Sequence, residues 1–304
     1  MLREFYNNYI KNLIKTEQEI LDRNHQFLPE GKIGELYTAG RVLKRGLVQI
    51  PTVSVNVGMG CSLRCKDCDQ WNPYLKNSNV KQRSYEDICR IFDALVRHVD
   101  YIGRVNIIGG EALIHPDIVK IVRYVAQCKK VGQTLIVTNG TIALSQELID
   151  VCKEYHVLIW VNRYDKSRKW NDVEKACRLN GILITTAISQ QWETMGRYGE
   201  RHNYSRKELV ESAEKCFLTM CMGIYGNVLY RCGVCGIIEE EGLGEERKLC
   251  KIELCRVRSK LSMMLRLYGM YAATYMEGCR FCVQPKDRKK IRAGVQIGEE
   301  NEEK

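Results

Sequence analysis

Apolar, β-branched residues recur in short runs through the middle of the chain, and most runs are followed by a segment with helical periodicity. The runs are TVSVNV (52–57), RVNIIGG (104–110), TLIVTNG (134–140), VLIWVN (157–162) and ILITTAI (182–188). The helical patterns lie near residues 84–99, 116–131, 145–155 and 170–180. Near-continuous apolar strands that alternate with helices predict a parallel sheet buried on both faces. Functional groups are then expected at the carboxyl ends of the strands.

The pattern changes on both sides of this region, which predicts four parts. Residues 1–50 predict a helical extension, 51–213 the strand–helix units, 214–284 a cysteine-rich appendage and 285–304 a charged flexible tail. About six strand–helix units fit before residue 235, so an open or partial barrel is favoured over the eight units of a complete one. In the appendage, two short apolar runs joined by YGN (225–227) predict a β-hairpin.

Composition excludes several classes of protein. The chain has 304 residues, 45% of them hydrophobic, which is enough for a large core. It lacks a run of eighteen apolar residues and a signal-peptide pattern at its start, so we expect a cytoplasmic protein that does not span a membrane. The net charge of +10 is not gathered in a basic helix with aromatics, so nucleic acid is not expected as a partner. The charge suits an anionic small molecule or an acidic electron-donor protein.

Fifteen cysteines need a reason other than disulfides, because a reducing cytosol disfavours disulfides. Four lie singly in helical segments and are interpreted as small buried hydrophobes: Cys89, Cys128, Cys152 and Cys177. The others form two groups, three at 61–68 and eight between 216 and 282. Thiolate groups of this kind favour zinc or iron–sulfur sites.

The first group, Cys61, Cys65 and Cys68, follows the first strand, where a site is expected. Four cysteines close a [4Fe–4S] cluster, so three would leave one iron open to a small ligand. Zinc with a remote fourth ligand, or three incidental thiols, are the alternatives. No histidine lies nearby, and zinc sites are usually built from paired C-x₂-C arms.

The C-x₃-C-x₂-C spacing of these cysteines resembles the signature of the radical S-adenosylmethionine (SAM) superfamily. The stretch IIGGEALIHPDI resembles its Gly-Gly-Glu motif, at Gly109, Gly110 and Glu111. The resemblance covers about residues 50–235. It implies a partial (β/α)6 radical SAM barrel, a SAM-binding [4Fe–4S] cluster, and a 5′-deoxyadenosyl radical that takes hydrogen from a substrate.

The resemblance also implies SAM contacts at the ends of successive strands. Glu111 is expected to accept hydrogen bonds from the SAM ammonium group, while glycines allow a close backbone approach. Further contacts are expected from Thr138, Asn139, Asn162, Ser189 and Gln190. Asp67 stands where the family often has an aromatic residue, so Trp71 is expected to offer an aromatic face to the adenine.

The second cysteine group resembles a shortened SPASM, or twitch, appendage that holds one auxiliary [4Fe–4S] cluster. The family pattern points to Cys216, Cys232, Cys279 and Cys282. Either Cys221 or Cys235 is an alternative ligand. Together with Cys250 and Cys255 they make four further cysteines, so a second auxiliary cluster is another alternative. A zinc ribbon from Cys232/Cys235 and Cys279/Cys282 is the other interpretation, although their separation exceeds the usual spacing.

The whole layout resembles twitch-type dehydrogenases acting on cyclitols and amino sugars, and radical SAM proteins of bacterial surface-polysaccharide synthesis. It implies a polar, hydroxylated substrate, and phosphorylated or nucleotide-linked substrates are included. The substrate would undergo a net oxidation in which the auxiliary cluster accepts an electron. A flavodoxin- or ferredoxin-type protein is the expected electron donor. The candidate acid–base residues follow the fourth and fifth strands: Arg163, Asp165 and His202, with Gln191, Arg201 and Tyr204. Peptide modification, and a non-catalytic zinc-binding docking protein, are the alternatives.

Overall fold

The computed structural model describes residues 48–77, 82–164, 170–188, 191–216, 218 and 222–298. The helical extension predicted over residues 1–50 therefore lies almost entirely outside the described residues. Within the described ranges, none of the helices has the length and apolar character needed to cross a membrane.

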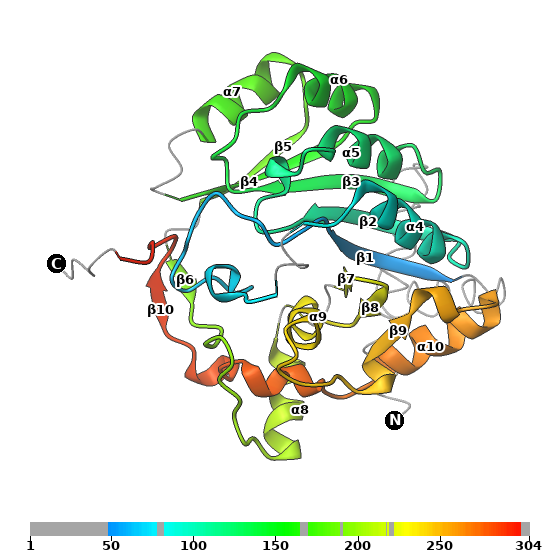
Figure 1. Cartoon of the computed structure of the whole chain (residues 1–304), viewed down its shortest axis with the longest axis vertical. Helices are drawn as coiled ribbons and strands as arrows, with labels where there is room; N and C mark the ends of the chain where they lie inside the picture. The colour runs from blue at the N-terminus through cyan, green and yellow to red at the C-terminus, as the bar shows by residue number, and fades with distance from the viewer. Residues whose placement is uncertain are drawn as a thin grey trace, which may run out of the picture.

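An eight-stranded sheet forms the centre of the molecule (Figure 1). Its spatial order is β5-β4-β3-β2-β1-β7-β8-β9. The strands are β1 (Gln49–Asn56), β2 (Tyr101–Ile108), β3 (Val131–Thr138), β4 (Leu158–Arg163), β5 (Ile184–Ile188), β7 (Met222–Tyr225), β8 (Val228–Tyr230) and β9 (Lys251–Glu253). Strands β1 to β5 pair in parallel, each with the next in the chain.

The parallel strands confirm the predicted α/β class with its mostly parallel sheet. Every residue of β1 is buried, as expected for a strand covered on both faces. The five apolar runs seen in the sequence are the five strands β1 to β5, and their carboxyl ends meet at one edge of the sheet. This common edge is what brings the loops after successive strands together.

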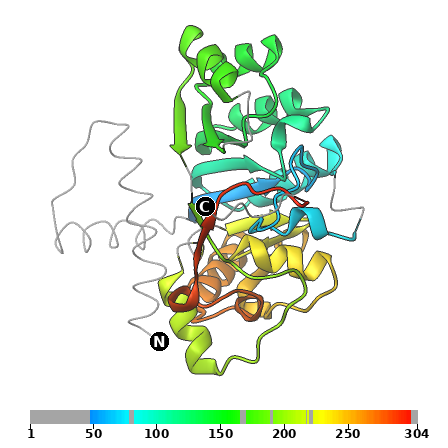
Figure 2. The ribbon, with the colours of Figure 1, turned by 90° about the vertical axis from the view of Figure 1, so that its left-hand side faces the viewer.

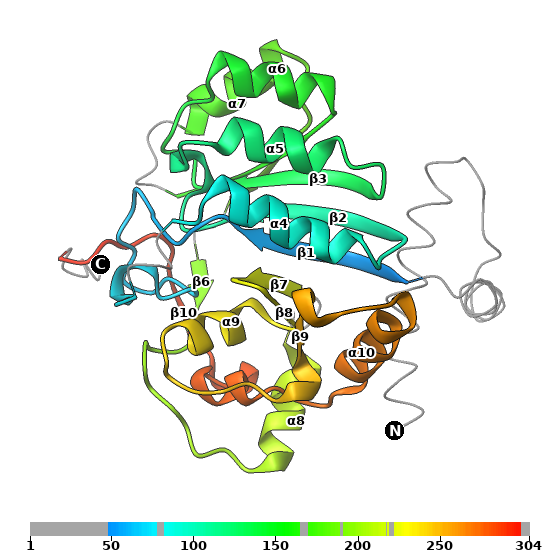
Figure 3. The same cartoon turned by 45° about the vertical axis from the view of Figure 1, so that its right-hand side comes forward.

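Helices cover one face of the parallel strands, in a row that Figure 3 shows from the side. The helices of this row are α4 (Tyr85–Val96), α5 (Ile118–Ala126), α6 (Gln146–Glu154) and α7 (Trp170–Leu179). The other helices lie with the cysteine-rich segment: α8 (Arg206–Lys215), α9 (Gly233–Glu240) and α10 (Lys260–Ala272). Serine side chains cap several of them by accepting a backbone N–H of the first turn: Ser84, Ser145, Ser205 and Ser259. Local sequence thus determines where these helices begin.

The cysteine-rich segment continues the central sheet. Strand β7 pairs in parallel with β1 on the side away from β2, and β9 lies at the edge of the sheet opposite β5. The hairpin predicted from YGN is formed by β7 and β8, with Gly226 at φ 51° in its turn, and β9 extends it. Helices α9 and α10 pack beside these strands.

A separate two-stranded sheet joins β6 (Gln191–Glu193) to β10 (Lys290–Arg292) in antiparallel pairing. Figure 2 shows the C-terminal segment (red) running along the body of the protein. Residues 285–298 are therefore packed against the rest of the chain, where the sequence predicted a flexible tail. Residues 299–304 lie outside the described residues.

Two hydrophobic clusters fill the interior. The larger lies between the sheet and the helices over it, and it includes Cys152 and Cys177 as the sequence predicted. Cys89 and Cys128 are half-buried. The smaller packs the loop after β1 against α9 and its surroundings, with Trp71, Tyr225 and Phe281 among its members.

Candidate functional site

A cavity of about 550 Å³ lies at the carboxyl ends of the parallel strands. Its walls come from residues 61–72 of the loop after β1, from the ends of β2, β3 and β4, and from β6 with the residue stretch that follows it. This volume is within the range of small-molecule and cofactor sites. The sequence placed its candidate residues on this edge because parallel strands share it.

Cys61, Cys65 and Cys68 all line the cavity. They lie on the segment 57–77, called here the cysteine loop, which turns back through a hydrogen bond from Trp71 N to Cys68 O of 2.9 Å. Burial raises the pKa of the Cys61 thiol and raises that of Cys68 to about 12. Without a cationic ligand these thiols stay protonated, whereas a coordinating thiol loses its proton.

The arrangement of these cysteine side chains does not support a site for a single metal ion. Among the residues that the structure describes, no three Cys, His, Asp or Glu side chains form a group that could hold one metal ion. A single zinc ion needs its ligands to converge on one point, with sulfurs at about 2.3 Å from the metal. In an iron–sulfur cluster each cysteine binds a different iron, so the thiols can be further apart.

Gly109 and Gly110 line the cavity at the end of β2. Gly110 N donates to Gly58 O at 3.0 Å, which holds the two strand ends together. A Cβ on Gly110 would lie 2.3 Å from Asn72 Nδ2 and 2.5 Å from Gly60 O. The glycine is therefore required by the close approach of the cysteine loop, whereas the sequence had suggested the approach of a ligand.

Glu111 is buried behind this turn, with 2% of its surface exposed. Its Oε1 accepts from Leu113 N at 3.0 Å and its Oε2 from Asn139 N at 2.7 Å. Burial raises the pKa of Glu111, although the two backbone donors oppose the shift. In this arrangement its carboxylate joins the end of β2 to the end of β3 and does not line the cavity.

The turn after β3 and the end of β4 bring three predicted residues to the cavity wall, Thr138, Asn139 and Asn162. Asn139 Nδ2 donates to Cys61 Sγ at 3.6 Å and to Ser62 Oγ at 3.2 Å. Asn162 Oδ1 accepts from Trp160 Nε1 at 3.0 Å. The ends of β3 and β4 thus meet the cysteine loop around one space.

Three other predicted residues are engaged elsewhere and do not line the cavity. Trp71 is buried in the smaller cluster, and its Nε1 donates to Gly196 O at 3.0 Å. The Arg163 guanidinium stacks on Trp170, 3.3 Å from the ring centroid. His202 stacks on Tyr204 with ring centroids 5.0 Å apart. Asp165, Ser189 and Gln190 lie outside the described residues.

Part of the chain matches the model of a known protein family. Residues 55–165, from β1 to just beyond β4, match the family model described as the Radical SAM superfamily. The matched part is a little over a third of the chain. The match is a similarity of this part of the chain to a superfamily whose enzymes use SAM and a [4Fe–4S] cluster. No curated protein matches the sequence.

Solved structures similar to this chain include other proteins with low sequence identity. BtrN in complex with AdoMet and 2-DOIA aligns with a TM-score of 0.48 and 12% identity, over 77% of this chain and 92% of that one. Streptococcus suis SuiB bound to precursor peptide SuiA aligns with a TM-score of 0.36 and 16% identity, over 57% and 44%. Native anSMEcpe with bound AdoMet and Cp18Cys peptide gives 0.36 and 12%, over 45% and 42%. In these last two alignments the chain spans less than half the length of the matched protein.

The residues of the matched part fit the cofactors that the Radical SAM superfamily uses. Three thiols supply the soft ligands that iron–sulfur clusters take. Gln70 and Asn72 line the same cavity, and Gln70 Oε1 and Asn72 Nδ2 are buried without a hydrogen-bond partner among the described residues. Buried polar atoms of this kind are normally satisfied, so they favour a polar ligand in this space.

The cavity also has lining residues that the sequence did not single out. Asp69 follows the third cysteine directly, and Glu193 lies on β6. Tyr164 and Trp192 contact each other edge to face, with ring centroids 5.2 Å apart, and supply aromatic surface where Trp71 does not. The only signal was their place in the rim stretches CKDCDQWN, NRYD and SQQWE.

The second cysteine group surrounds a small cavity of about 20 Å³. It is lined by the four predicted ligands and one alternative: Cys216, Cys232, Cys235, Cys279 and Cys282. Cys250 and Cys255 do not line it, and Cys221 lies outside the described residues. The Cys235 thiol donates to Cys232, which lowers the pKa of Cys232 and raises that of Cys235.

Two buried guanidinium groups flank these cysteines. Arg288 Nη2 donates to Cys216 Sγ at 3.6 Å, and the Arg288 side chain is 4% exposed. Arg231 is 5% exposed and donates to Ala273 O, and its Nε has no partner among the described residues. Burial lowers the pKa of Arg231. Buried cations beside thiols fit an anionic occupant, such as a thiolate-ligated cluster.

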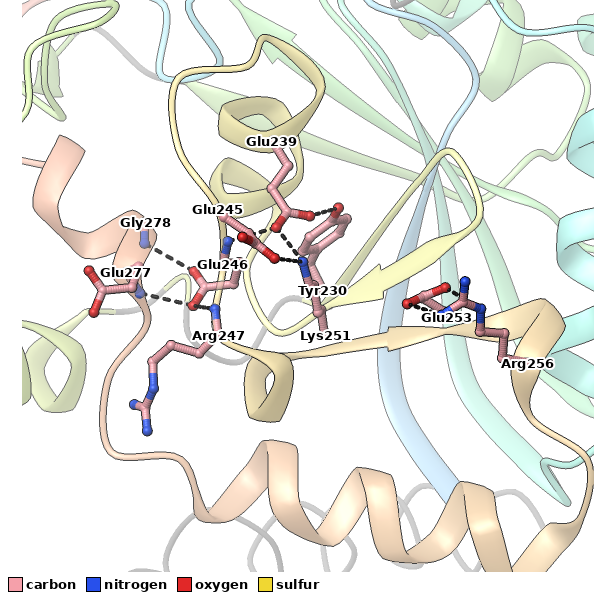
Figure 4. Close-up of polar contacts among 10 residues, drawn as sticks. All are labelled: Tyr230, Glu239, Glu245, Glu246, Arg247, Lys251, Glu253, Arg256, Glu277 and Gly278. Atoms are coloured by element: carbon pink, nitrogen blue, oxygen red, sulfur yellow. Dashed lines mark hydrogen bonds and ion pairs between the residues drawn. The ribbon is translucent and has the colours of Figure 1, made fainter.

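Glutamates of α9 and the loop after it fix the cysteine-bearing segments to one another (Figure 4). Glu246 accepts hydrogen bonds from Glu277 N at 2.9 Å and Gly278 N at 3.0 Å, at the start of the turn that carries Cys279. Glu239 accepts from Lys251 Nζ at 2.5 Å, which ties α9 to β9.

Proposed function

We propose that the protein is a radical SAM enzyme that oxidises a polar, hydroxylated small molecule. The observation that carries this proposal is the convergence of Cys61, Cys65 and Cys68 with Gly110 and Asn139 on one cavity of about 550 Å³. When bound, SAM and its cluster supply a 5′-deoxyadenosyl radical that removes a hydrogen atom from the substrate. The protein must bind and orient the substrate and exclude water.

The charge of the cavity favours a substrate without phosphate. Three carboxylates line it, those of Asp67, Asp69 and Glu193, and no Lys or Arg is among the lining residues of the described part of the chain. A phosphate or nucleotide diphosphate would be repelled by these groups, whereas hydroxyl and ammonium groups would be attracted. We therefore favour an uncharged or cationic polyol, such as a sugar or cyclitol, over the phosphorylated or nucleotide-linked substrates.

Glu193 is the proposed acceptor of the substrate proton. It lies on β6 in the cavity wall, and its Oε2 is 3.5 Å from Arg288 Nη1. Oxidation of a secondary alcohol removes a hydrogen atom from carbon, then a proton from the hydroxyl oxygen and one electron, and leaves a carbonyl group. A carboxylate within reach of the hydroxyl can take that proton.

The proposed route of the electron leads to the second cysteine group. Met195 lines both the large cavity and the small cavity among Cys216, Cys232, Cys235, Cys279 and Cys282. Met195 is therefore part of the wall of both the proposed substrate space and the proposed auxiliary-cluster site. This shared wall supports a net two-electron oxidation, with a flavodoxin- or ferredoxin-type protein as the proposed reductant for the SAM cleavage.

The test begins with iron and sulfide contents of anaerobically purified protein. About eight irons per chain, falling to about four in the Cys61→Ala/Cys65→Ala/Cys68→Ala variant, are expected from two [4Fe–4S] clusters. The protein should then form 5′-deoxyadenosine from SAM under reducing conditions, at a rate that rises with a polyol from a panel of sugars, cyclitols, their amino and phosphorylated derivatives, and peptides. Zinc without iron would overturn the proposal, and stimulation by peptides alone would favour peptide modification.

Glu193→Gln separates the proton-transfer role from binding. We expect product formation to fall by about 10²-fold or more, with 5′-deoxyadenosine formation largely kept, because the hydrogen-atom removal precedes proton transfer. Glu200→Gln, at an exposed position, is the matched control. Equal losses of both products in Glu193→Gln would contradict the assigned role.

A further inference from the structure

Residues 293–297 run alongside the cysteine loop, between its first and third cysteines. Lys66 N donates to Val295 O at 2.7 Å, and Ile297 N donates to Arg64 O at 2.9 Å. These two backbone hydrogen bonds flank Cys65, which bridges to Gln296. A segment near the C-terminus is thus paired with the part of the chain that bears the proposed cluster ligands.

The Gln296 side chain makes two different contacts with this loop. Its Oε1 accepts from Arg64 N at 2.7 Å, which anchors the backbone. Its Nε2 donates to Cys65 Sγ at 3.3 Å and to Gly294 O at 2.6 Å. One end of the amide therefore holds the loop, and the other offers an N–H to a sulfur atom.

The walls of the cavity hold this segment in place. Strand β10 pairs with β6, where Ile291 lies opposite Trp192, a lining residue. Gly294 has φ 71°, and a Cβ there would lie 3.0 Å from the Cβ of Tyr164, another lining residue. Only glycine suits both this backbone conformation and this close approach. The position of Gln296 is thus fixed by residues of the site itself.

We propose that Gln296 is a positioning residue that sets the reduction potential of the cluster ligated by Cys61, Cys65 and Cys68; this rests on the proposed function. A reduced iron–sulfur cluster carries one more negative charge than the oxidised one. An N–H donor to a ligand sulfur stabilises that charge and raises the potential, as hydrogen bonds to cluster sulfurs generally do. An easier reduction favours the electron transfer that begins SAM cleavage.

Two variants separate an effect of Gln296 on the reduction potential from its role in holding the backbone of the cysteine loop. Gln296→Glu keeps an oxygen that can accept from Arg64 N but cannot donate to Cys65. Gln296→Met has a side chain of similar length with neither function. Gln146→Met is the matched control, because Gln146 is an exposed residue on α6 that bonds Asp150. All are compared as full-length, anaerobically reconstituted proteins of measured iron content.

The measurement is a redox titration followed by electron paramagnetic resonance, with added SAM identifying the signal of the SAM-binding cluster. We expect the reduction equilibrium of that cluster to become less favourable by about tenfold in Gln296→Met, equivalent to about 59 mV for one electron. In Gln296→Glu the loss should be at least as large, since a carboxylate adds negative charge near the sulfur. The second cluster should titrate as in wild type.

The outcomes of these measurements distinguish the proposal from its alternatives. If the reduction potential is unchanged in both variants, Gln296 does not set it, and the proposal is wrong. If both variants lose iron while Gln146→Met retains it, Gln296 is a structural anchor of the cysteine loop, and the proposal is also wrong. If one variant fails to hold iron, the other decides by its potential. A wild-type protein without a SAM-responsive cluster would instead overturn the proposed function, a failure that is recognised before any variant is measured.

Discussion

Glu111 and Asn139 are joined by a hydrogen bond of 2.7 Å from the backbone N of Asn139 to Oε2 of Glu111. The other oxygen of Glu111 accepts from Leu113 N at 3.0 Å. Asn139 in turn donates to Cys61 Sγ. A buried carboxylate, shielded from the cavity, thus connects the ends of β2 and β3 to the first cysteine of the cysteine loop.

The Glu111→Gln variant tests this connection. Glutamine has one oxygen, so its NH₂ group would face one of the two backbone N–H donors and leave that donor unsatisfied. We expect a loss of about 1–3 kcal/mol in the free energy of unfolding. Urea titration of the iron-free protein measures it. Glu154→Gln, which removes only a half-exposed partner of Arg123, is the control, and equal stability of the two variants would contradict the role of Glu111.

Gly110 allows the cysteine loop to approach β2. In Gly110→Ala the new Cβ would meet Gly60 O and Met59 O at 2.5 and 2.6 Å, and both are backbone atoms. Because the loop must shift, we expect the free energy of unfolding to fall by about 1–3 kcal/mol. We also expect less iron in the proposed cluster of Cys61, Cys65 and Cys68. In Gly244→Ala the Cβ would meet its neighbours at ordinary contact distances of 3.5 Å or more. That variant should retain wild-type stability and iron, measured by the same titration and assay.

Arg288 connects the two proposed centres, because Nη2 contacts Cys216 and Nη1 lies 3.5 Å from Glu193. We expect Arg288→Met to reduce the iron content from about eight toward four per chain, since a buried positive charge beside the thiolates is lost. Arg288→Lys keeps the charge without the forked donors and should retain an intermediate content. The exposed Arg256→Met is the control. Full iron content in Arg288→Met would show that the cluster does not need this cation.

The strands and the convergence of their ends were predictable because local pattern determines both. Buried parallel strands have apolar runs, and their carboxyl ends must share an edge, so Cys61, Gly110, Asn139 and Asn162 could be placed together from the sequence. The pairing of β10 with β6 was not predictable. Each strand has three residues, and about a hundred residues separate them in the chain, so neither periodicity nor a turn signal marks the pair.

Side-chain partners were the least predictable feature of the site. Arg163 and Trp71 lie in the predicted rim stretches, but contacts with Trp170 and Gly196 determine where their side chains lie. These partners come from other segments, and the sequence pattern does not specify which aromatic or carbonyl group is nearest. Glu193 and Gln296 became candidates only when long-range pairing placed them beside the cavity and Cys65.

The small cavity predicts which of the later cysteines hold iron. Cys282 lines it, whereas Cys250 bonds to Tyr275 O and the exposed Cys255 bonds to Asn227. We expect Cys282→Ser to lose about four irons per chain, and Cys250→Ser and Cys255→Ser to lose none. Comparing Cys235→Ser with Cys232→Ser then identifies which of these two residues, at the start of α9, is the fourth ligand. Iron loss in Cys250→Ser would instead indicate a cluster outside this cavity.

The buried thiol of Cys250 gives a pH dependence whose sign follows from its environment. Burial raises its pKa to about 12, against about 8.5 for a thiol in an unfolded chain. Between these values the unfolded state has lost the proton and the folded state retains it. Stability therefore falls as pH rises from about 9, by at most about 1.4 kcal/mol per pH unit for this group. We expect Cys250→Ala to reduce the slope of unfolding free energy against pH between 9 and 10.5, relative to wild type, in urea titrations of the iron-free protein. An identical slope in both proteins would show that the Cys250 thiol ionises in the folded state.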